Sequence, residues 1–224
     1  MYAFNEPILH AAAALQRLRQ GNRRFVEDRC VAHGLASNQR KALARRQTPF
    51  AIILGCSDSR VPAELVFDQG LGDLFVIRVA GNIVAPSQIG SVEFAAATFG
   101  THLAVVMGHS ECGVIRAAVD ALGTGRKTES GLKPGLKPKL KKGLESPSLS
   151  TIVDRVTPNL SPLMEMYPED DQALVAAATR ANVLASVDQL RSGSDILDGL
   201  VSDGQLRIVG AHCSLETGVV EFYS

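Results

Sequence analysis

Tryptophan is absent from this chain of 224 residues, aromatic residues make up only 5% of it, and cysteine occurs four times. No apolar run approaches the roughly 18 residues of a membrane-spanning helix, so no membrane span is expected. Lys plus Arg and Asp plus Glu both number 23, and this balance argues against nucleic acid or a membrane surface as a partner. A chain of this length is also not a small disulfide scaffold. The N-terminal stretch has no arginine or lysine before its apolar residues, so it resembles an amphipathic helix more than a signal peptide, which is the alternative. We therefore expect a cytoplasmic protein.

The length suits one domain over residues 1–224, with an N-terminal helical arm over 1–48. Hydrophobic residues reach 46%, which is high for a lone domain, so we expect part of the apolar surface to be buried between subunits. Residues 123–150 carry seven basic and two acidic side chains and several prolines. This stretch is predicted to be a mobile basic loop inserted in the domain; a docking site for an anionic partner is the alternative.

Apolar runs of strand length alternate with helical patterns along the rest of the chain. Continuous apolar runs are typical of strands buried on both faces of a parallel sheet, and strands alternating with helices indicate βαβ units. The pattern therefore predicts an α/β fold with a mostly parallel central sheet flanked by helices and a C-terminal edge hairpin. The expected strands are 50–55, 74–79, 103–107, 206–211 and 219–222; the expected helices are 7–27 with a break near Gly21, 89–99, 114–122, and 151–191 with interruptions at its prolines.

Chemically active side chains follow two of these strands. Cys56 comes directly after the strand at 50–55, and His109 and Cys112 follow the strand at 103–107. Open α/β sheets place their ligands at the carboxyl ends of strands, so the three side chains can approach one point. Two thiolates and an imidazole suit tetrahedral Zn²⁺, and three protein ligands leave a fourth position open, as in catalytic sites.

Asp58 and Arg60 lie two and four residues beyond Cys56. A carboxylate beside a metal either ligates it or is held away by a cation, and a guanidinium pairs with a carboxylate through two hydrogen bonds. An ordinary ion pair at the end of a strand is the alternative for these two residues.

The spacing Cys56-x-Asp58-x-Arg60, with His109-x-x-Cys112 about fifty residues later, resembles the signature of the β-class carbonic anhydrases. The resemblance extends over most of the chain. It implies reversible hydration of carbon dioxide to bicarbonate and a proton, by attack of a zinc-bound hydroxide. Cys56, His109 and Cys112 would bind one Zn²⁺ per subunit, and Asp58 and Arg60 would form a catalytic dyad, with Asp58 as a possible fourth ligand in a closed state. Further stretches that match are 21–25, 72–78, 80–82 and 217–221.

The resemblance also implies a substrate pocket and self-association into dimers or tetramers. Gln47 matches a glutamine that hydrogen-bonds the substrate from across a dimer interface. Regulation by bicarbonate is not expected, because the position of the tryptophan in that regulatory pocket is Ile53 here, although Arg78 matches the pocket's arginine. The residues implied in substrate binding are Gln47, Phe75, Ala80, Gly81, Phe94 and Gly113.

Two other functions stay open on these residues. Hydrolases of carbon disulfide and carbonyl sulfide resemble the same scaffold and metal site. A non-catalytic zinc-thiolate redox switch or scaffold subunit is the other alternative, and the Asp58–Arg60 pair argues against it because a structural zinc site needs neither residue. Two thiolates already neutralise Zn²⁺, so we expect activity that rises through mildly alkaline pH.

Overall fold

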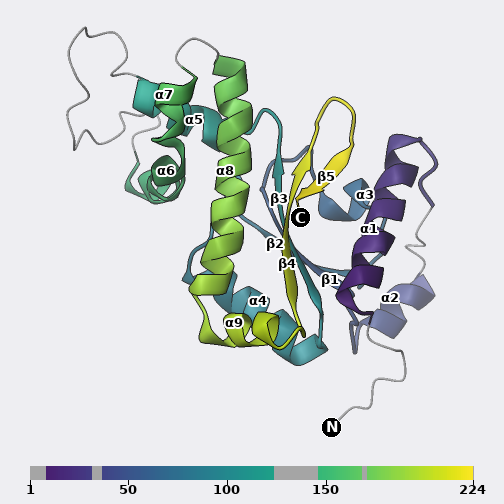
Figure 1. Ribbon diagram of the computed structural model, residues 1–224. Helices are drawn as coiled ribbons and strands as arrows, with labels where there is room; N and C mark the ends of the chain where they lie inside the picture. Colours follow the sequence, from purple (N-terminus) through teal and green to yellow (C-terminus); the bar gives the residue numbers. More distant parts are fainter. Residues whose placement is uncertain (1–8, 32–36, 124–145, 168–170, 224) are drawn as a thin grey trace, which may run out of the picture.

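A five-stranded sheet forms the centre of the molecule (Figure 1). The computed structural model describes residues 9–31, 37–123, 146–167 and 171–223. The strand order is β2-β1-β3-β4-β5; the first four strands are parallel, and β5 runs antiparallel to β4 at one edge. The predicted α/β fold and its edge hairpin are thus confirmed. The strands are β1 (Ala51–Gly55), β2 (Leu74–Arg78), β3 (Leu103–His109), β4 (Arg207–Cys213) and β5 (Val220–Tyr223).

Helices cover both faces of this sheet, which explains why its central strands are apolar throughout. Every residue of β1 and of β3 is buried. In Figure 1, α1 and α3 lie on one side of the sheet and α8, α4 and α9 on the other. The helices are α1 (Ala11–Val26), α2 (Ser37–Leu43), α3 (Ala63–Val66), α4 (Pro86–Phe99), α5 (Gly113–Gly123), α6 (Pro147–Leu160), α7 (Leu163–Met166), α8 (Asp171–Ser192) and α9 (Asp195–Ser202), with the 3₁₀ turn η1 at Ala80–Asn82.

The first helix does not break at Gly21, contrary to the prediction. Gly21 lies inside α1 and is buried, because α1 packs there against the end of α3. A Cβ atom added to Gly21 would lie 1.8 Å from the carbonyl oxygen of Phe67. The glycine therefore serves close helix packing and not a turn.

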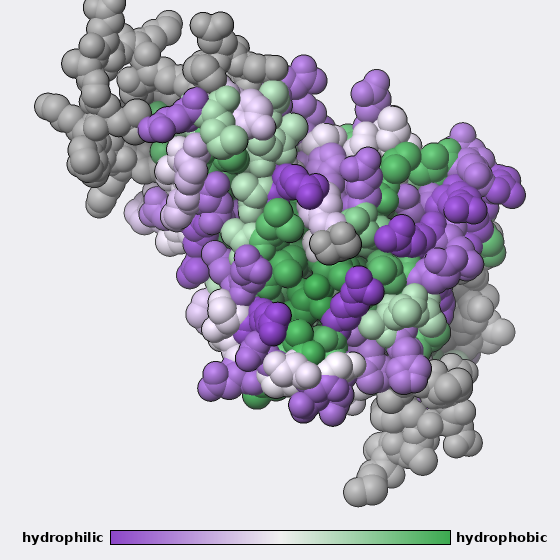
Figure 2. Space-filling view, viewed as in Figure 1, coloured by the Kyte–Doolittle hydropathy of each residue, from purple (hydrophilic) through white to green (hydrophobic). Residues whose placement is uncertain are grey.

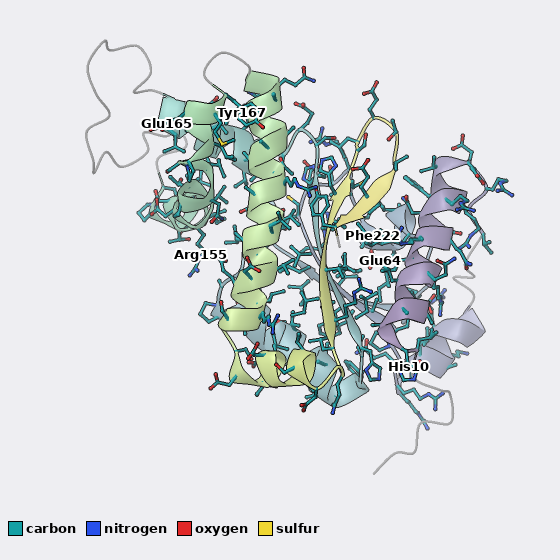
Figure 3. All side chains as sticks on the ribbon, viewed as in Figure 1. His10, Glu64, Arg155, Glu165, Tyr167 and Phe222 are labelled. Atoms are coloured by element: carbon teal, nitrogen blue, oxygen red, sulfur yellow. The ribbon has the colours of Figure 1, made fainter. Side chains whose placement is uncertain are left out.

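The strand β5 forms one edge of the sheet, and a side chain of β5 packs against α1 and the end of α3. Phe222 points from β5 toward α1 and α3 (Figure 3), where its ring stacks on that of Phe67 at 6.1 Å between centroids. The guanidinium of Arg19 lies 5.0 Å from the centre of the Phe222 ring. Figure 2 shows apolar side chains at the surface over β4 and β5, between α8 and α1.

The segment between α5 and α8 differs from the prediction in two places. Both ends of the stretch 123–150, expected to be a loop, are helical: Gly123 is the last residue of α5 and α6 starts at Pro147, while residues 124–145 lie outside the described part. Pro158 does not interrupt the helix, since α6 continues to Leu160. Among the described helices, none is long and apolar enough to cross a membrane.

Candidate metal centre

Two neighbouring parallel strands bring three potential metal ligands together. Cys56 follows β1, His109 is the last residue of β3, and Cys112 directly precedes α5. Their ligand atoms all lie within 4.8 Å of one another. The three residues are only 4%, 1% and 2% exposed. The structure therefore assembles, in a water-poor position, the donor set that the sequence pattern placed at the strand ends.

The imidazole of His109 is oriented with one nitrogen toward this group. Nδ1 lies 2.8 Å from the carbonyl oxygen of Ser110, so Nδ1 carries the proton and Nε2 offers its lone pair. Nε2 is buried and has no hydrogen-bond partner among the described residues; the nearest oxygen of Asp58 is 4.0 Å away. Burial alone would lower the pKa of His109, but its interactions with the Cys56 thiolate and the Ser110 carbonyl raise it above the usual value.

The sulfur of Cys56 lies in an environment that favours the thiolate. It accepts hydrogen bonds from the backbone N–H groups of Asp58 and Gly81, each at 3.4 Å. A hydrogen bond from Cys112, together with His109 and these two N–H groups, holds the pKa of Cys56 well below its usual value despite burial. The pKa of Cys112 is raised, because its proton is shared with Cys56 and because it is buried.

The chemistry of this donor set fits zinc. Cysteine sulfur and histidine nitrogen are the commonest zinc ligands, and a buried lone pair without a partner is costly unless a cation binds it. Binding a divalent ion would also replace the proton shared by the two sulfurs. Among the described residues, Cys56, His109 and Cys112 are the one group of three such side chains close enough to hold a metal ion.

Asp58 is held beside the group by Arg60. The Nε and Nη2 atoms of Arg60 donate to the two carboxylate oxygens of Asp58 at 2.9 and 2.8 Å, and the backbone N–H of Arg60 adds a third bond at 3.0 Å. These hydrogen bonds, chiefly that of the guanidinium, hold the pKa of Asp58 well below its usual range. The carboxylate is therefore ionised and directed toward the arginine.

Ser110 ties the loop between His109 and Cys112 to the hairpin that follows β4. Its backbone N–H donates to the carbonyl of Cys213 at 3.0 Å, and its hydroxyl oxygen accepts the N–H of Leu215 at 2.8 Å. The carbonyl of the same residue orients His109, so Ser110 links the metal-ligand loop to an independent part of the sheet.

Comparison with known proteins agrees with this geometry. The family described as carbonic anhydrase matches residues 51–220, which include every residue of the site described so far. This chain belongs to the β-carbonic anhydrase family. Carbonic anhydrase 2 of Mycobacterium tuberculosis is 33% identical over 212 residues, covering 95% of this chain and 92% of that protein.

Solved structures of the family have the same fold. The β-carbonic anhydrase CcaA matches with a TM-score of 0.69 at 24% identity, over 94% of this chain and 87% of that one. A structure from the study of two tetrameric β-carbonic anhydrases of Sordaria macrospora matches with a TM-score of 0.66 at 23% identity, over 84% and 87% of the two chains. At this level of identity the likeness concerns the fold.

The family resemblance implies six substrate-binding residues in this carbonic anhydrase, and three of them lie close to the metal-ligand loops. Ala80 and Gly81 form η1, and the Gly81 N–H reaches Cys56. Gly81 has a φ of +72°, and an added Cβ would lie 2.8 Å from Val114. Gly113 begins α5, but an added Cβ there would meet no described atom within 4 Å.

The other three implied substrate residues lie away from the chain's own metal ligands. Gln47 precedes β1 whereas Cys56 follows it, so the strand separates them by about 17 Å. Gln47 lines an exposed groove of about 610 Å³ together with Phe99. Phe75 lies near the start of β2, and its ring packs 6.2 Å from that of Phe94, which is 54% exposed.

Two features of the site were missed at the level of sequence. Arg78 was matched only to a regulatory pocket, but its guanidinium donates to the backbone carbonyls of Cys56 and Asp58 and so supports the loop after β1. On α8, Asn182 and Ser186 bond to η1. The available signal was polar residues at helical spacing within an otherwise apolar stretch of that helix.

Proposed function

We propose that this carbonic anhydrase catalyses the reversible hydration of carbon dioxide to bicarbonate and a proton, with one Zn²⁺ per subunit held by Cys56, His109 and Cys112. The observation that carries the proposal is a buried group of two sulfurs and one unpartnered imidazole nitrogen beside a carboxylate that an arginine holds in place. A purely structural zinc site would need neither Asp58 nor Arg60.

When bound, zinc would act as a Lewis acid that makes water a nucleophile near neutral pH. The protein's own contribution is orientation. Arg60 keeps the Asp58 carboxylate ionised and fixed, with Oδ2 4.0 Å from His109 Nε2. From this position Oδ2 can accept a hydrogen bond from a water molecule entering the site and align it for attack. We propose these roles for Asp58 and Arg60 as the catalytic dyad.

We further propose that the active unit is a dimer or a larger homo-oligomer in which Gln47 of one subunit faces the metal centre of the other. The position of Gln47, beyond the opposite end of β1 from Cys56, supports this arrangement. Phe75 and Phe94 would then line the carbon dioxide pocket between subunits, since carbon dioxide is apolar and Phe94 is exposed in the single chain. The apolar surface over β4 and β5 offers a further interface for tetramers (Figure 2).

A cytoplasmic location is also proposed. All four cysteines are free thiols, and thiols stay reduced in that compartment.

The test is stopped-flow hydration of carbon dioxide on protein whose zinc content has been measured. We expect stoichiometric zinc and rapid hydration in the wild type, and loss of hydration with zinc retained in Asp58→Ala. Replacing Asp198 by Ala removes a carboxylate of an exposed pair with Arg191 and should change nothing. Hydrolysis of carbonyl sulfide or carbon disulfide in place of hydration, or full activity in Asp58→Ala, would contradict the proposal.

A further inference from the structure

A second layer of polar residues lies behind the candidate metal centre, between α8 and η1. Asn182 and Ser186 are 1% and 2% exposed and lie one helical turn apart on α8. Neither residue belongs to the group of metal ligands. Buried polar side chains in a helix that packs on a sheet are costly unless they make specific hydrogen bonds.

The side chains of both residues donate hydrogen bonds to backbone carbonyls of η1. The side-chain amide of Asn182 donates to the carbonyl of Gly81 at 2.9 Å, and the hydroxyl of Ser186 donates to the carbonyl of Asn82 at 3.2 Å. The N–H of Asn82 donates in turn to Val79 at 3.0 Å. The peptide plane that joins Gly81 to Asn82 is therefore fixed at both its oxygen and its nitrogen.

The turn held in this way has an uncommon backbone conformation. Gly81 and Asn82 have φ angles of +72° and +42°, so two consecutive residues lie in the left-handed region. Such a conformation persists only where surrounding contacts determine it. With the following peptide plane fixed, the φ and ψ angles of Gly81, +72° and +17°, decide where its own N–H points, and this N–H points at the sulfur of Cys56, 3.4 Å away.

We propose that Asn182 and Ser186 are positioning residues of the metal centre, which act from α8 through η1 to hold the Gly81 N–H on the Cys56 sulfur. An N–H group that donates to a metal-bound thiolate limits the charge that the sulfur gives to the metal and fixes the direction of its lone pairs. Partners behind the ligands typically change metal affinity by about 10–100-fold. This inference rests on the proposed function, because it requires that Cys56 binds a metal.

The experiment compares three substitutions on the same helix. Asn182→Leu and Ser186→Ala remove the two bonds to η1. Thr179→Val is the matched control, because Thr179 is also a buried polar residue of α8, 2% exposed, but among the described residues its hydroxyl bonds to Val175 of its own helix, at 2.8 Å, and not to η1. The measurements are the rate of zinc release to a chelator, the sulfur-to-metal charge-transfer band of the cobalt-substituted proteins, and the free energy of unfolding in urea.

We expect Asn182→Leu to release zinc about 10–100-fold faster than Thr179→Val and to shift the charge-transfer band. Ser186→Ala should change the zinc release rate and the charge-transfer band in the same direction, by a smaller amount. If Asn182→Leu does not fold, the comparison of Ser186→Ala with Thr179→Val tests the inference. Release rates and bands equal to those of Thr179→Val would overturn the inference, since a role in helix packing alone would change only the free energy of unfolding. A wild-type protein without stoichiometric zinc would overturn the proposed function together with it, so the two failures are distinguishable.

Discussion

Arg60 holds Asp58 by both carboxylate oxygens, at 2.9 and 2.8 Å, and through the same Nη2 atom it donates to the carbonyl of Glu111 at 3.2 Å. One side chain thus connects the loop after β1 with the loop after β3, which carry Cys56 and Cys112. The pair is more than a surface ion pair, because its geometry sets the position of the carboxylate relative to both loops.

Replacing Arg60 by Gln should lower the rate of carbon dioxide hydration at least about tenfold while zinc is retained. The guanidinium is the largest cause of the lowered Asp58 pKa, so its loss should let that pKa return toward the ordinary value and free the carboxylate to turn. Stopped-flow assays with metal analysis check this. Arg191→Gln, which breaks the exposed pair with Asp198, is the control; equal rates in Arg60→Gln and Arg191→Gln would refute the role of Arg60.

Activity should rise between pH 7 and pH 9. Two thiolate ligands, Cys56 and Cys112, would neutralise the charge of a bound Zn²⁺, so water at this centre would be activated less than at one with three neutral imidazoles, where the pKa of the bound water is about 7. The pH dependence of kcat on fully zinc-loaded protein measures this. A kcat that stays flat from pH 6 to pH 9 would contradict the argument from ligand charge.

Ser110→Ala should lower the free energy of unfolding by about 1 kcal/mol and speed the release of zinc. The substitution leaves the N–H of Leu215 without its acceptor and loosens the link between the ligand loop and the hairpin after β4. Ser214→Ala is a matched control, because the Ser214 hydroxyl accepts its backbone N–H from within the hairpin, that of Thr217 at 3.2 Å, and not from the ligand loop. Zinc release equal in the two variants would contradict the role of Ser110.

Cys213→Ala should make the stability of the protein less sensitive to alkaline pH. Burial raises the pKa of the Cys213 thiol to about 11. The unfolded chain loses this proton near pH 9 and the folded chain does not, so this stabilising contribution is full below pH 9 and is lost as the pH rises toward 11. The wild type should lose about 2 kcal/mol more than Cys213→Ala between pH 8 and pH 11. Urea unfolding at several pH values measures the difference, and parallel curves would exclude the effect.

Two inactive variants, Gln47→Ala and Asp58→Ala, should regain carbon dioxide hydration when they are refolded together as a mixture. If Gln47 acts on the partner's metal centre, a mixed dimer contains one complete site, in the subunit that keeps Asp58. Equal mixing should then return about a quarter of the wild-type activity, since half of the dimers are mixed. Separately refolded proteins combined without exchange are the control. Absence of recovery in verified mixed dimers would place Gln47 outside the site.

The central strands and the ligand group were predictable because their signals are local. A strand buried on both faces has an uninterrupted apolar run, as in β1 and β3, and parallel strands end at the same edge of the sheet. Cys56 and His109 could therefore be placed together from their positions after such runs.

Features that depend on distant partners could not be predicted in this way. Gly21 resembled a helix break because its true reason, the close approach of the Phe67 carbonyl, comes from the end of α3, far away in the sequence. The bonds of Asn182 and Ser186 depend on how α8 crosses the sheet. Gln47 precedes β1 and Phe75 lies near the start of β2, both away from the strand ends that carry the ligands, so the roles proposed for them depend on a second subunit that the sequence does not place.

The division of the ligands between two strands also has a consequence for biogenesis. Cys56 leaves the ribosome well before His109. Until β3 pairs with β1, the Cys56 thiol has no second ligand beside it and cannot chelate a metal ion. Because the sheet is held together by its apolar core, chains made under zinc starvation should accumulate as folded apoprotein that is ready to load. Metal uptake would then be the last step of maturation, and bound metal would indicate that β1 and β3 have paired.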